Sequence, residues 1–386
     1  MSVAHPADPS AYWSPRFELV RHRPEEPVQS PHHPGEINKL LKRRRRAWDD
    51  ADVGGHRKSP RRMQPPPLVL ALGGNSISRR DDEPSVGAQF ERARETCELL
   101  VPLIASGKWR VVITHGNGPQ VGNILLRSDL AAEAGELPRI PVDAAVADTQ
   151  GAMGYMLQQS LAGALWESGL RVPVVTVVTQ VIVDEDDPAF AAPAKPIGRF
   201  YPPGAVADLE RHGWVMTEQD GGWRRVVPSP MPREIVEEEV VRELLGAGVV
   251  VIACGGGGIP VVVSESGRLR GVEAVVDKDH ASSLLASHVG APVFVMLTDV
   301  DRIAVDRGTE SERRLDEVEV DELAVYEQEG HFPAGSMGPK VRAAIDFVAR
   351  GGTRAIVTTP ERVEDALAGR AGTHVVAART EAAATR

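Results

Sequence analysis

Three short apolar runs, each followed at once by a glycine-rich turn, constrain this chain more than any other feature of its sequence. Runs of branched apolar residues predict buried strands, and glycine at their ends permits sharp turns and close backbone approaches. The runs are residues 69–72, 111–114 and 249–253, and the turns after them are Gly73-Gly74-Asn75, Gly116-Asn117-Gly118 and Gly255-Gly256-Gly257-Gly258.

Helix-like segments separate the predicted strands along the chain. Helical patterns span about 86–106 and 152–166, and apolar runs at 174–183, 293–297 and 355–357 predict further strands. Strands that alternate with helices are typical of a parallel sheet covered on both faces. We therefore predict an α/β fold, namely an open αβα sandwich with a mainly parallel central sheet and a small protruding subdomain.

The composition divides the chain into three parts. Residues 1–66 are rich in Pro, His and Arg without a helical or strand period, which predicts a poorly ordered Pro/Arg-rich extension. An alternative is that the true start is Met63. Residues 67–380 carry the alternating pattern and are expected to form the folded domain. Within them, residues 184–230 are rich in Pro, Gly and charge, which predicts an inserted lid subdomain, because a structureless loop that long is uncommon.

The formal net charge of −10 is unevenly distributed. Residues 1–67 hold 13 Lys and Arg against 8 Asp and Glu, a balance of +5, which leaves −15 on the rest of the chain. An acidic body disfavours nucleic-acid binding, and the basic run at 42–46 is interpreted as a solvated charge run rather than a site for an acidic partner. Without any run of 18 apolar residues, and with only Cys97 and Cys254, we expect no membrane span, no disulfide framework and a cytoplasmic location.

The glycine turns predict an anion site at one edge of the sheet. Ligands of open α/β sheets bind outside the carboxyl ends of the strands, and each turn is expected to lead into a helix N-terminus that favours anions. The chain has no Gly-x-x-x-x-Gly-Lys-Ser/Thr motif, and the turns at 116–121 and 255–260 lack the third glycine of a dinucleotide fingerprint. A P-loop enzyme is therefore excluded, and a nicotinamide dehydrogenase is disfavoured.

Two lysines stand where the first turn of a helix is expected, although a cation there opposes the helix dipole. Lys278 lies between Asp277 and Asp279, and Lys340 follows Pro339, a residue suited to the first helical position. A phosphate bound close to both lysines would reverse this unfavourable interaction. Departures from local rules of this kind are expected at functional sites.

These features together predict phosphoryl transfer, which requires positioning of the transferred group and neutralisation of its charge. Amides of the glycine turns, those of Gly256 and Gly257 among them, would bind phosphate oxygens while the lysines follow the charge. Asp277 or Asp279 would orient a lysine or hold Mg²⁺. Covalent catalysis is disfavoured because the possible nucleophiles have no evident base partner. They are Ser76, Ser336 and Cys254.

A series of long motifs runs in order through about residues 68–376. They are LGGN at 72–75, HGNGPQVGN at 115–123, TQGAMGY at 149–155, TQV at 179–181, KPIG at 195–198, GWRRVVPSP at 222–230, CGGGGIPVV at 254–262, GVEAVVDKD at 271–279 and HFPAGSMGPK at 331–340. Together they resemble the carbamate kinases, a family within the amino acid kinase superfamily. The resemblance implies an amino acid kinase domain over residues 67–380 and a homodimer.

The resemblance also implies a reaction. ATP and carbamate would give ADP and carbamoyl phosphate reversibly, with Mg²⁺. The ATP-forming catabolic direction is expected, at the end of arginine, agmatine or purine breakdown.

The resemblance further implies roles for individual residues. Lys278 and Lys340 match lysines that stabilise the transferring phosphoryl group, and Asp279 matches the aspartate that organises them. Lys195, which by its pattern alone reads as a solvated lysine, matches a subdomain lysine that reaches toward carbamate, and Asp277 remains the candidate Mg²⁺ ligand. The residues matching the phosphoryl and carbamate loops are Gly73, Gly74, Asn75, Gly116 and Asn117. The residues expected on the nucleotide side are Thr298, Asp299, Val300, Asp301 and Met337.

Some features depart from the family pattern, and two rival functions stay open. Asp299 replaces a usual glycine, Gly338 stands where a bulkier residue often sits, and the extension is not a family feature. One rival is a related kinase acting on acetylglutamate, glutamate, aspartate or a nucleotide, against which the insert with Lys195 argues. The other is a non-catalytic sensor of carbamoyl phosphate or adenine nucleotide, against which the retained lysines argue.

Overall fold

An eight-stranded, mainly parallel sheet forms the centre of the computed structural model, which describes residues 64–74, 77, 85–219, 221–332 and 337–378. All these residues belong to the second of two compact units, Ser59–Arg386. Six adjacent strands, from β16 to β3, run parallel, and the pair β15 and β17 runs against them. The spatial order is β15 (Glu317–Glu319), β17 (Thr373–Val376), β16 (Arg354–Thr358), β12 (Val293–Leu297), β1 (Pro67–Leu72), β2 (Arg110–His115), β9 (Val250–Ile252) and β3 (Val174–Thr176).

Strand β1 lies in the middle of this sheet and is buried along its whole length. Leu70 is in register with Val295 of β12 on one side and Ile113 of β2 on the other. A parallel strand covered on both faces reads as a continuous apolar run, which is the pattern of residues 68–72. The strand predicted before the first glycine turn is therefore confirmed as β1.

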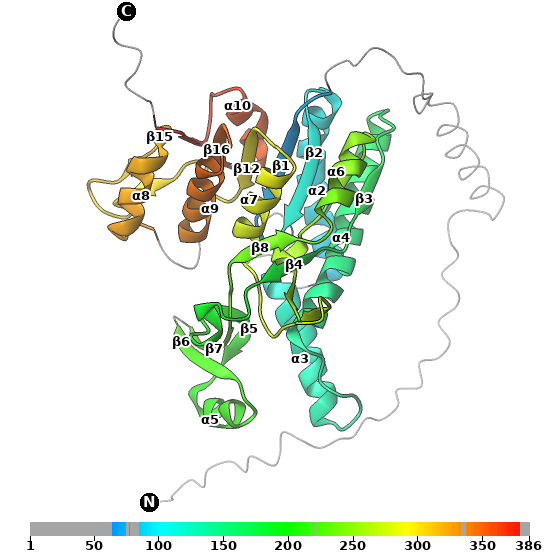
Figure 1. The fold of residues 1–386 in the computed structure, drawn as a ribbon, viewed down its shortest axis with the longest axis vertical. Helices are drawn as coiled ribbons and strands as arrows, with labels where there is room; N and C mark the ends of the chain where they lie inside the picture. The colour runs from blue at the N-terminus through cyan, green and yellow to red at the C-terminus, as the bar shows by residue number, and fades with distance from the viewer. Residues whose placement is uncertain (1–63, 75–76, 78–84, 220, 333–336, 379–386) are drawn as a thin grey trace, which may run out of the picture. The chain divides into compact units, whose positions relative to one another are not determined.

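Helices cover both faces of the sheet, which confirms the predicted αβα sandwich (Figure 1). On one face, α6 to α9 contribute side chains to a core with Val69 and Ala71, while on the other α2, α4 and α10 pack against Leu68 and Leu70. The helices are α2 (Val86–Ala105), α4 (Val142–Glu167), α6 (Glu238–Gly246), α7 (Lys278–His288), α8 (Val320–Gln328), α9 (Met337–Ala349) and α10 (Val363–Leu367).

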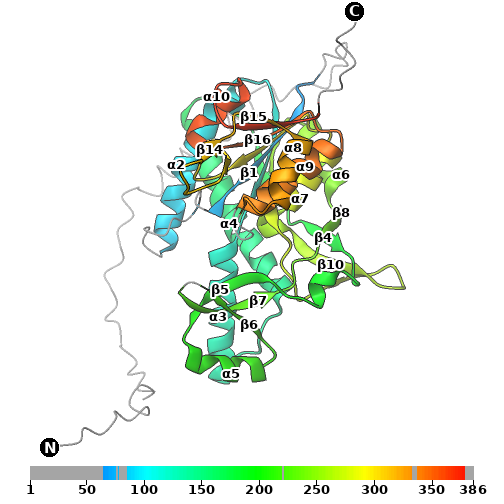
Figure 2. The same ribbon diagram turned by 90° about the vertical axis from the view of Figure 1, so that its left-hand side faces the viewer.

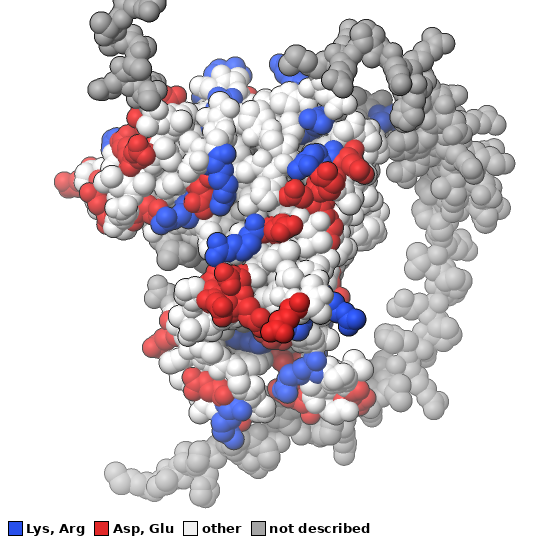
Figure 3. All heavy atoms as spheres, in the orientation of Figure 1, with Lys and Arg blue, Asp and Glu red and all other residues white. Residues whose placement is uncertain are grey.

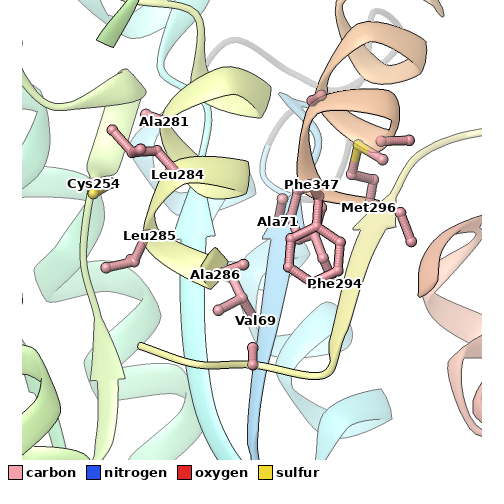
Figure 4. Packing of buried hydrophobic residues seen from close by; sticks show 14 of the residues in the cluster. Val69, Ala71, Cys254, Ala281, Leu284, Leu285, Ala286, Phe294, Met296 and Phe347 are labelled. Atoms are coloured by element: carbon pink, nitrogen blue, oxygen red, sulfur yellow. The ribbon is translucent and has the colours of Figure 1, made fainter. Parts of the chain in front are cut away.

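The core beneath α7 and α9 is built from alternate residues of the sheet strands (Figure 4). The rings of Phe294 and Phe347 pack edge to face with centroids 5.6 Å apart, and both side chains are fully buried. Burying a side chain of this size contributes about 1.5–3 kcal/mol relative to leaving it exposed. This packing fixes α7 and α9 on the sheet, and with them the lysines at their N-terminal ends.

Three smaller sheets complete the described fold. A four-stranded sheet has the order β11-β10-β4-β8, β13 pairs with β14, and an antiparallel sheet has the order β5-β7-β6. The last sheet and α5 lie beside α3 in Figures 1 and 2, within the predicted insert. The remaining elements are α3 (Gly118–Glu133), β4 (Gln180–Val183), β5 (Lys195–Tyr201), α5 (Pro203–Arg211), β6 (Val215–Gln219), β7 (Gly222–Val227), β8 (Pro232–Ile235), β10 (Ile259–Val263), β11 (Leu269–Gly271), β13 (Ala304–Val305) and β14 (Arg313–Arg314).

Two sequence predictions about strands and turns are wrong. Residues 174–183 do not form one strand but two, β3 and β4, which belong to different sheets. The chain turns between them at Thr179, whose hydroxyl donates to Val177 O and accepts from Cys254 N. The glycine run at 255–258 does not lead into an α-helix, because after a single 3₁₀ turn it enters β10.

Two helix starts also differ from the prediction. Helix α4 begins at Val142, ten residues before the predicted start, because polar residues such as Asp143 and Asp148 hid the buried positions Ala145 and Val146. Helix α9 begins at Met337, so Pro339 is its third residue rather than its first. Proline is tolerated there because the first-turn N–H groups have no partner inside the helix.

The face of the molecule shown in Figure 3 carries a continuous group of acidic side chains below its middle, with smaller basic and acidic groups and wide uncharged areas around it. No helix in the described part of the chain is long and apolar enough to cross a membrane. Because the chain after residue 67 carries a charge balance of −15, its overall field does not attract an anion, and lysines near an anion must act at short range.

Candidate active site

A cleft of about 450 Å³ opens at the carboxyl ends of β1, β2 and β12 and collects most of the predicted site residues. Asn75 lies outside the described residues. Gly257 and Asp301 are not among the residues that line the cleft, and Asp301 instead accepts a hydrogen bond from Thr358 Oγ1 at 3.0 Å. The predicted residues in the lining are Gly73, Gly74, Gly116, Asn117, Lys195, Gly256, Asp277, Lys278, Asp279, Thr298, Asp299, Val300, Met337 and Lys340.

Helix α7 places an aspartate and a lysine at the base of the cleft. Asp277 caps the helix, because its Oδ1 accepts a hydrogen bond from Asp279 N at 2.8 Å. Lys278 is therefore the first helical residue, as predicted, and its Nζ donates to Leu72 O at 3.2 Å, at the end of β1. The cap and this bond hold the ammonium group over the carboxyl edge of the sheet.

The carboxylate of Asp279 joins the two lysines predicted to act together. Lys278 Nζ lies 3.0 Å from Asp279 Oδ1, and Lys340 Nζ donates to Asp279 Oδ2 at 2.9 Å. All three side chains are at most 12% exposed. Asp279 and Lys340 are 61 residues apart in sequence, so two cations from different helices share one buried anion.

The three groups shift one another's pKa. Burial would raise the pKa of Asp279, but Lys278 and Lys340 outweigh this effect and hold it well below its usual range. Burial lowers the pKa of Lys278, with partial compensation by Asp279. Burial also acts to lower the pKa of Lys340, but attraction to Asp279, Asp277 and Asp299 raises it overall. The site therefore holds an ionised carboxylate in contact with both lysines before any anion binds.

Lys195 reaches the same cleft from the three-stranded sheet and pairs with Asp277 Oδ2. Burial opposes ionisation of Asp277, but the charge of Lys195 lowers its pKa overall. Strand β5 approaches α3 closely at Gly122 and Gly198, since a Cβ added to Gly122 would lie 2.3 Å from Gly198 Cα. These two glycines let the insert bring Lys195 to Asp277, at the start of α7.

The glycines of the turns serve chiefly to let backbone segments meet. A Cβ on Gly73 would lie 2.9 Å from Leu297 O, and one on Gly256, where φ is +67°, would lie 2.2 Å from Asn117 Nδ2. The amides of Gly73 and Gly257 donate to Leu297 O and Cys254 O. The N–H groups of Gly73 and Gly257 are therefore already used within the protein. These glycines contribute the close approach of one backbone segment to another.

Sequence reasoning missed the buried scaffold behind the turns. Gln150 accepts from Thr179 N at 2.8 Å and donates to Thr179 O and Gly255 O, both at 3.0 Å. Asn117 Nδ2 donates to Thr149 Oγ1 at 2.8 Å. Thr149, Gln150 and Thr179 belong to the TQGAMGY and TQV motifs. The polar residues of these motifs were therefore the sequence signal that could have indicated a buried hydrogen-bonded scaffold.

His115 is a buried titratable group beside the cleft and yields a test of stability against pH. Burial lowers its pKa to about 4 from an ordinary 6.5, opposed by a hydrogen bond to Gly116 O and helped by Lys278. As pH falls, the unfolded chain takes up this proton first, so stability present above pH 6.5 is lost between pH 6.5 and 4. The loss should approach about 3 kcal/mol.

Urea unfolding of the wild type and of His115→Gln at several pH values measures this loss. We expect the wild type to lose more stability than the variant on acidification to pH 4.5. Equal losses in the two proteins would contradict a neutral, buried imidazole.

The carboxylates of the cleft do not by themselves make a metal site. Among the described residues, no group of three or more His, Cys, Asp or Glu side chains is placed to hold an ion. Both oxygens of Asp277 accept hydrogen bonds, from Asp279 N and Lys195 Nζ. Mg²⁺ binds oxygen atoms that are free to coordinate it. The carboxylate of Asp277, as it is arranged here, therefore fits a lysine rather than Mg²⁺.

The arrangement is suited to transferring an anionic group. Three lysines line one cleft at the carboxyl ends of parallel strands, where α/β sheets bind ligands. Cations fixed in a partly buried site stabilise charge that moves between donor and acceptor oxygens. Residues 66–359 match the amino acid kinase family, and the chain belongs to this family of phosphotransferases.

Within this family, the chain is similar to carbamate kinases. A carbamate kinase of Pyrococcus furiosus is 49% identical over 311 residues, which cover 80% of this chain and 98% of the relative. A carbamate kinase-like protein of Escherichia coli is 43% identical over 312 residues, covering 80% and 98%. The structure of carbamate kinase from Giardia lamblia bound to AMP-PNP superposes with a TM-score of 0.76 at 39% identity, covering 81% of this chain and 99% of that one.

Proposed function

We propose that this chain is a carbamate kinase, which transfers a phosphoryl group reversibly between ATP and carbamate. The observation that carries the proposal is that Lys278 and Lys340 both pair with Asp279, while Lys195 enters the same cleft from β5. We assign Lys278 and Lys340 to the moving phosphoryl group, and Lys195, which pairs with Asp277 in this structure, to the acceptor. We assign the ATP-forming, catabolic direction as the physiological one.

The chain's own residues account for the chemistry without a general base. Carbamate is an anion whose oxygen attacks directly, so no proton has to be removed from it. This agrees with the two carboxylates, since Asp277 and Asp279 are both paired with lysines rather than free to accept a proton. Asp279 instead fixes the spacing of the two ammonium groups that neutralise the transferring group.

The nucleotide side of the cleft is assigned to the loop after β12. Thr298, Asp299 and Val300 line the cleft there, together with Met337 at the start of α9. Mg²⁺, when bound, would neutralise phosphate charge, and we assign it mainly to the nucleotide phosphates because Asp277 is already paired. The phosphates would then lie toward Lys340, which carries the raised pKa.

Lys195→Ala should chiefly weaken binding of the acceptor. Because Lys195 lies on β5 rather than on α7 or α9, its loss removes one charge-assisted contact, worth about 1.5–3 kcal/mol. The Michaelis constant for carbamoyl phosphate should rise roughly 10- to 100-fold, with a smaller change in kcat.

Steady-state kinetics with carbamoyl phosphate varied at saturating ADP measure this effect. Lys108→Ala, which removes an exposed lysine outside the cleft, is the matched control. An unchanged Michaelis constant in Lys195→Ala would refute the acceptor assignment.

A panel of acceptors tests the function itself. Purified protein is offered ATP with carbamate, acetylglutamate, glutamate, aspartate or a nucleoside monophosphate, and ADP release is followed. We expect turnover with carbamate alone. Turnover with acetylglutamate but not carbamate would favour a related kinase, and nucleotide binding without turnover would favour a sensor.

We further propose a cytoplasmic homodimer in which the three-stranded sheet acts as a lid. Strand β3 is the edge of the main sheet, and Tyr155 and Val178 nearby are 58% and 55% exposed, which favours a partner along this edge. Cys97 and Cys254 are free and buried, which agrees with a reducing compartment. Light scattering at the mass of a single 41.5 kDa chain would contradict the dimer.

A further inference from the structure

Arg307 is a cleft-lining cation that the motifs did not single out. It follows β13, is exposed, and lines the same cleft as Thr298 and Val300, which precede β13 in the chain. Each lysine of the cleft is paired with Asp277 or Asp279. Among interactions between described residues, Arg307 forms no ion pair.

Arg307 makes the summed charge of the cleft-lining side chains positive. Four cations line the cleft, namely three lysines and Arg307, against the three carboxylates of Asp277, Asp279 and Asp299. Removing Arg307 would reduce the balance from +1 to zero. Asp299 is exposed, and its charge is felt at Lys340, so it also repels an anion arriving from this side. A cation that has no carboxylate partner among the described residues is the group best able to offset that repulsion.

The backbone before Arg307 is held in a strained conformation. Asp306 has φ of +54°, a region that residues other than glycine seldom adopt and that is most often retained at functional sites. Its N–H donates to His331 Nδ1 at 3.3 Å, and its carbonyl accepts from Thr309 N at 3.1 Å and Thr309 Oγ1 at 2.7 Å. These contacts fix the turn from which Arg307 projects.

His331 connects this turn to the chain that precedes α9. Its ring packs edge to face on Tyr326 of α8 at 5.5 Å, and its Nε2 lies 3.3 Å from Glu329 Oε2. These contacts fasten the β13–β14 turn beside α8. The strain at Asp306 is thus supported by packing and hydrogen bonds outside the cleft.

We propose that Arg307 binds the phosphate chain of the nucleotide, with Asp306 and His331 as its positioning residues. This inference rests on the proposed function, because it takes the ligand on this side to be a nucleoside di- or triphosphate. A guanidinium offers paired donors that match two phosphate oxygens, and it neutralises charge next to Asp299. Loss of one such contact, worth about 1.5–3 kcal/mol, corresponds to a weakening of roughly 10- to 100-fold.

Calorimetric titration of ADP and of adenosine into the wild type and Arg307→Gln tests the proposal. We expect ADP binding to weaken at least about tenfold while adenosine binding changes less than about twofold, since adenosine has no phosphate. Arg314→Gln, an exposed arginine of β14 outside the cleft lining, should bind ADP as the wild type does. The ADP affinity of Arg307→Lys should lie between those of the wild type and Arg307→Gln, because lysine keeps the charge without the paired donors.

The outcomes separate this inference from the function. Unchanged ADP binding in Arg307→Gln overturns the inference, and an equal loss for ADP and adenosine assigns Arg307 to the base instead. A wild type that binds no ADP overturns both the inference and the proposed function. Binding is measured without turnover, so a wild type that binds ADP but does not phosphorylate carbamate leaves the inference standing.

The positioning role has its own test. Asp306→Gly, which tolerates positive φ, should keep ADP binding within about threefold, and Asp306→Val, which does not, should lose it as Arg307→Gln does. Thermal melting checks that both variants fold. A folded Asp306→Val with wild-type ADP binding would contradict the positioning role.

Discussion

Lys278→Ala is expected to slow ATP formation from ADP and carbamoyl phosphate by at least about 100-fold while the protein stays folded. Removing one preorganised electrostatic stabiliser costs roughly 10²–10³ in kcat. Folding should survive because Asp279 keeps its hydrogen bond from Lys340, so no carboxylate is left without a cation. The buried position left by the side chain adjoins the cleft and is open to water.

The effect should appear in kcat more than in the Michaelis constants. A cation that interacts more strongly with the transition state than with bound substrate changes the rate of the chemical step. Luminescent detection of ATP with both substrates saturating measures it, and Lys108→Ala again controls for loss of a lysine. A kcat within about threefold of the wild type would remove Lys278 from the mechanism.

Asp279→Asn is expected to have the largest effect on stability. The asparagine keeps the shape of the carboxylate but leaves Lys278 and Lys340, both at most 12% exposed, without their shared anion. Removing one partner from a buried ion pair costs about 3–5 kcal/mol, because the remaining charge stays buried and unpaired. The repulsion between the two ammonium groups then adds to that cost.

Denaturant unfolding at pH 7.5 compares the wild type, Asp279→Asn and the control Asp346→Asn. Asp346 lies on α9 with its side chain 25% exposed and its ion-pair contacts at 3.8 Å or more, so its loss should cost less than about 1 kcal/mol. Turnover of Asp279→Asn should also fall at least about 100-fold, since the spacing of the two lysines is lost. Stability equal to that of the control would show that the lysines do not depend on Asp279.

The parallel core could be predicted from the sequence because burial on both faces leaves a local signal. The runs at 69–72 and 111–114 are continuous and apolar, and each became a central strand, β1 or β2. The run at 174–183 gave the same signal yet contains two strands in two sheets. What separates them is Thr179, whose partners Gln150 and Cys254 are distant in sequence.

The cleft, too, could be predicted only where its residues leave a local signal in the sequence. Lys278 and Lys340 were found because each breaks a local rule at a helix start, and the motifs supported them. Their shared contact with Asp279 spans 61 residues, so no local pattern reveals it. Arg307 gave no signal, since an arginine in a polar turn is an ordinary surface residue. Its interest comes from its place in the cleft lining, from its lack of an ion pair within the described part of the chain, and from the backbone of Asp306.

The central claim is that two lysines joined by Asp279 act on the phosphoryl group while it moves. Binding of ADP with and without aluminium fluoride, which mimics the transferring phosphoryl group, tests that claim most directly, in the wild type and in Lys278→Ala. We expect aluminium fluoride to tighten ADP binding at least about 100-fold in the wild type, as transition-state analogues do, and to lose that gain in the variant, with ADP alone bound equally by both. The same gain in both proteins would contradict the claim.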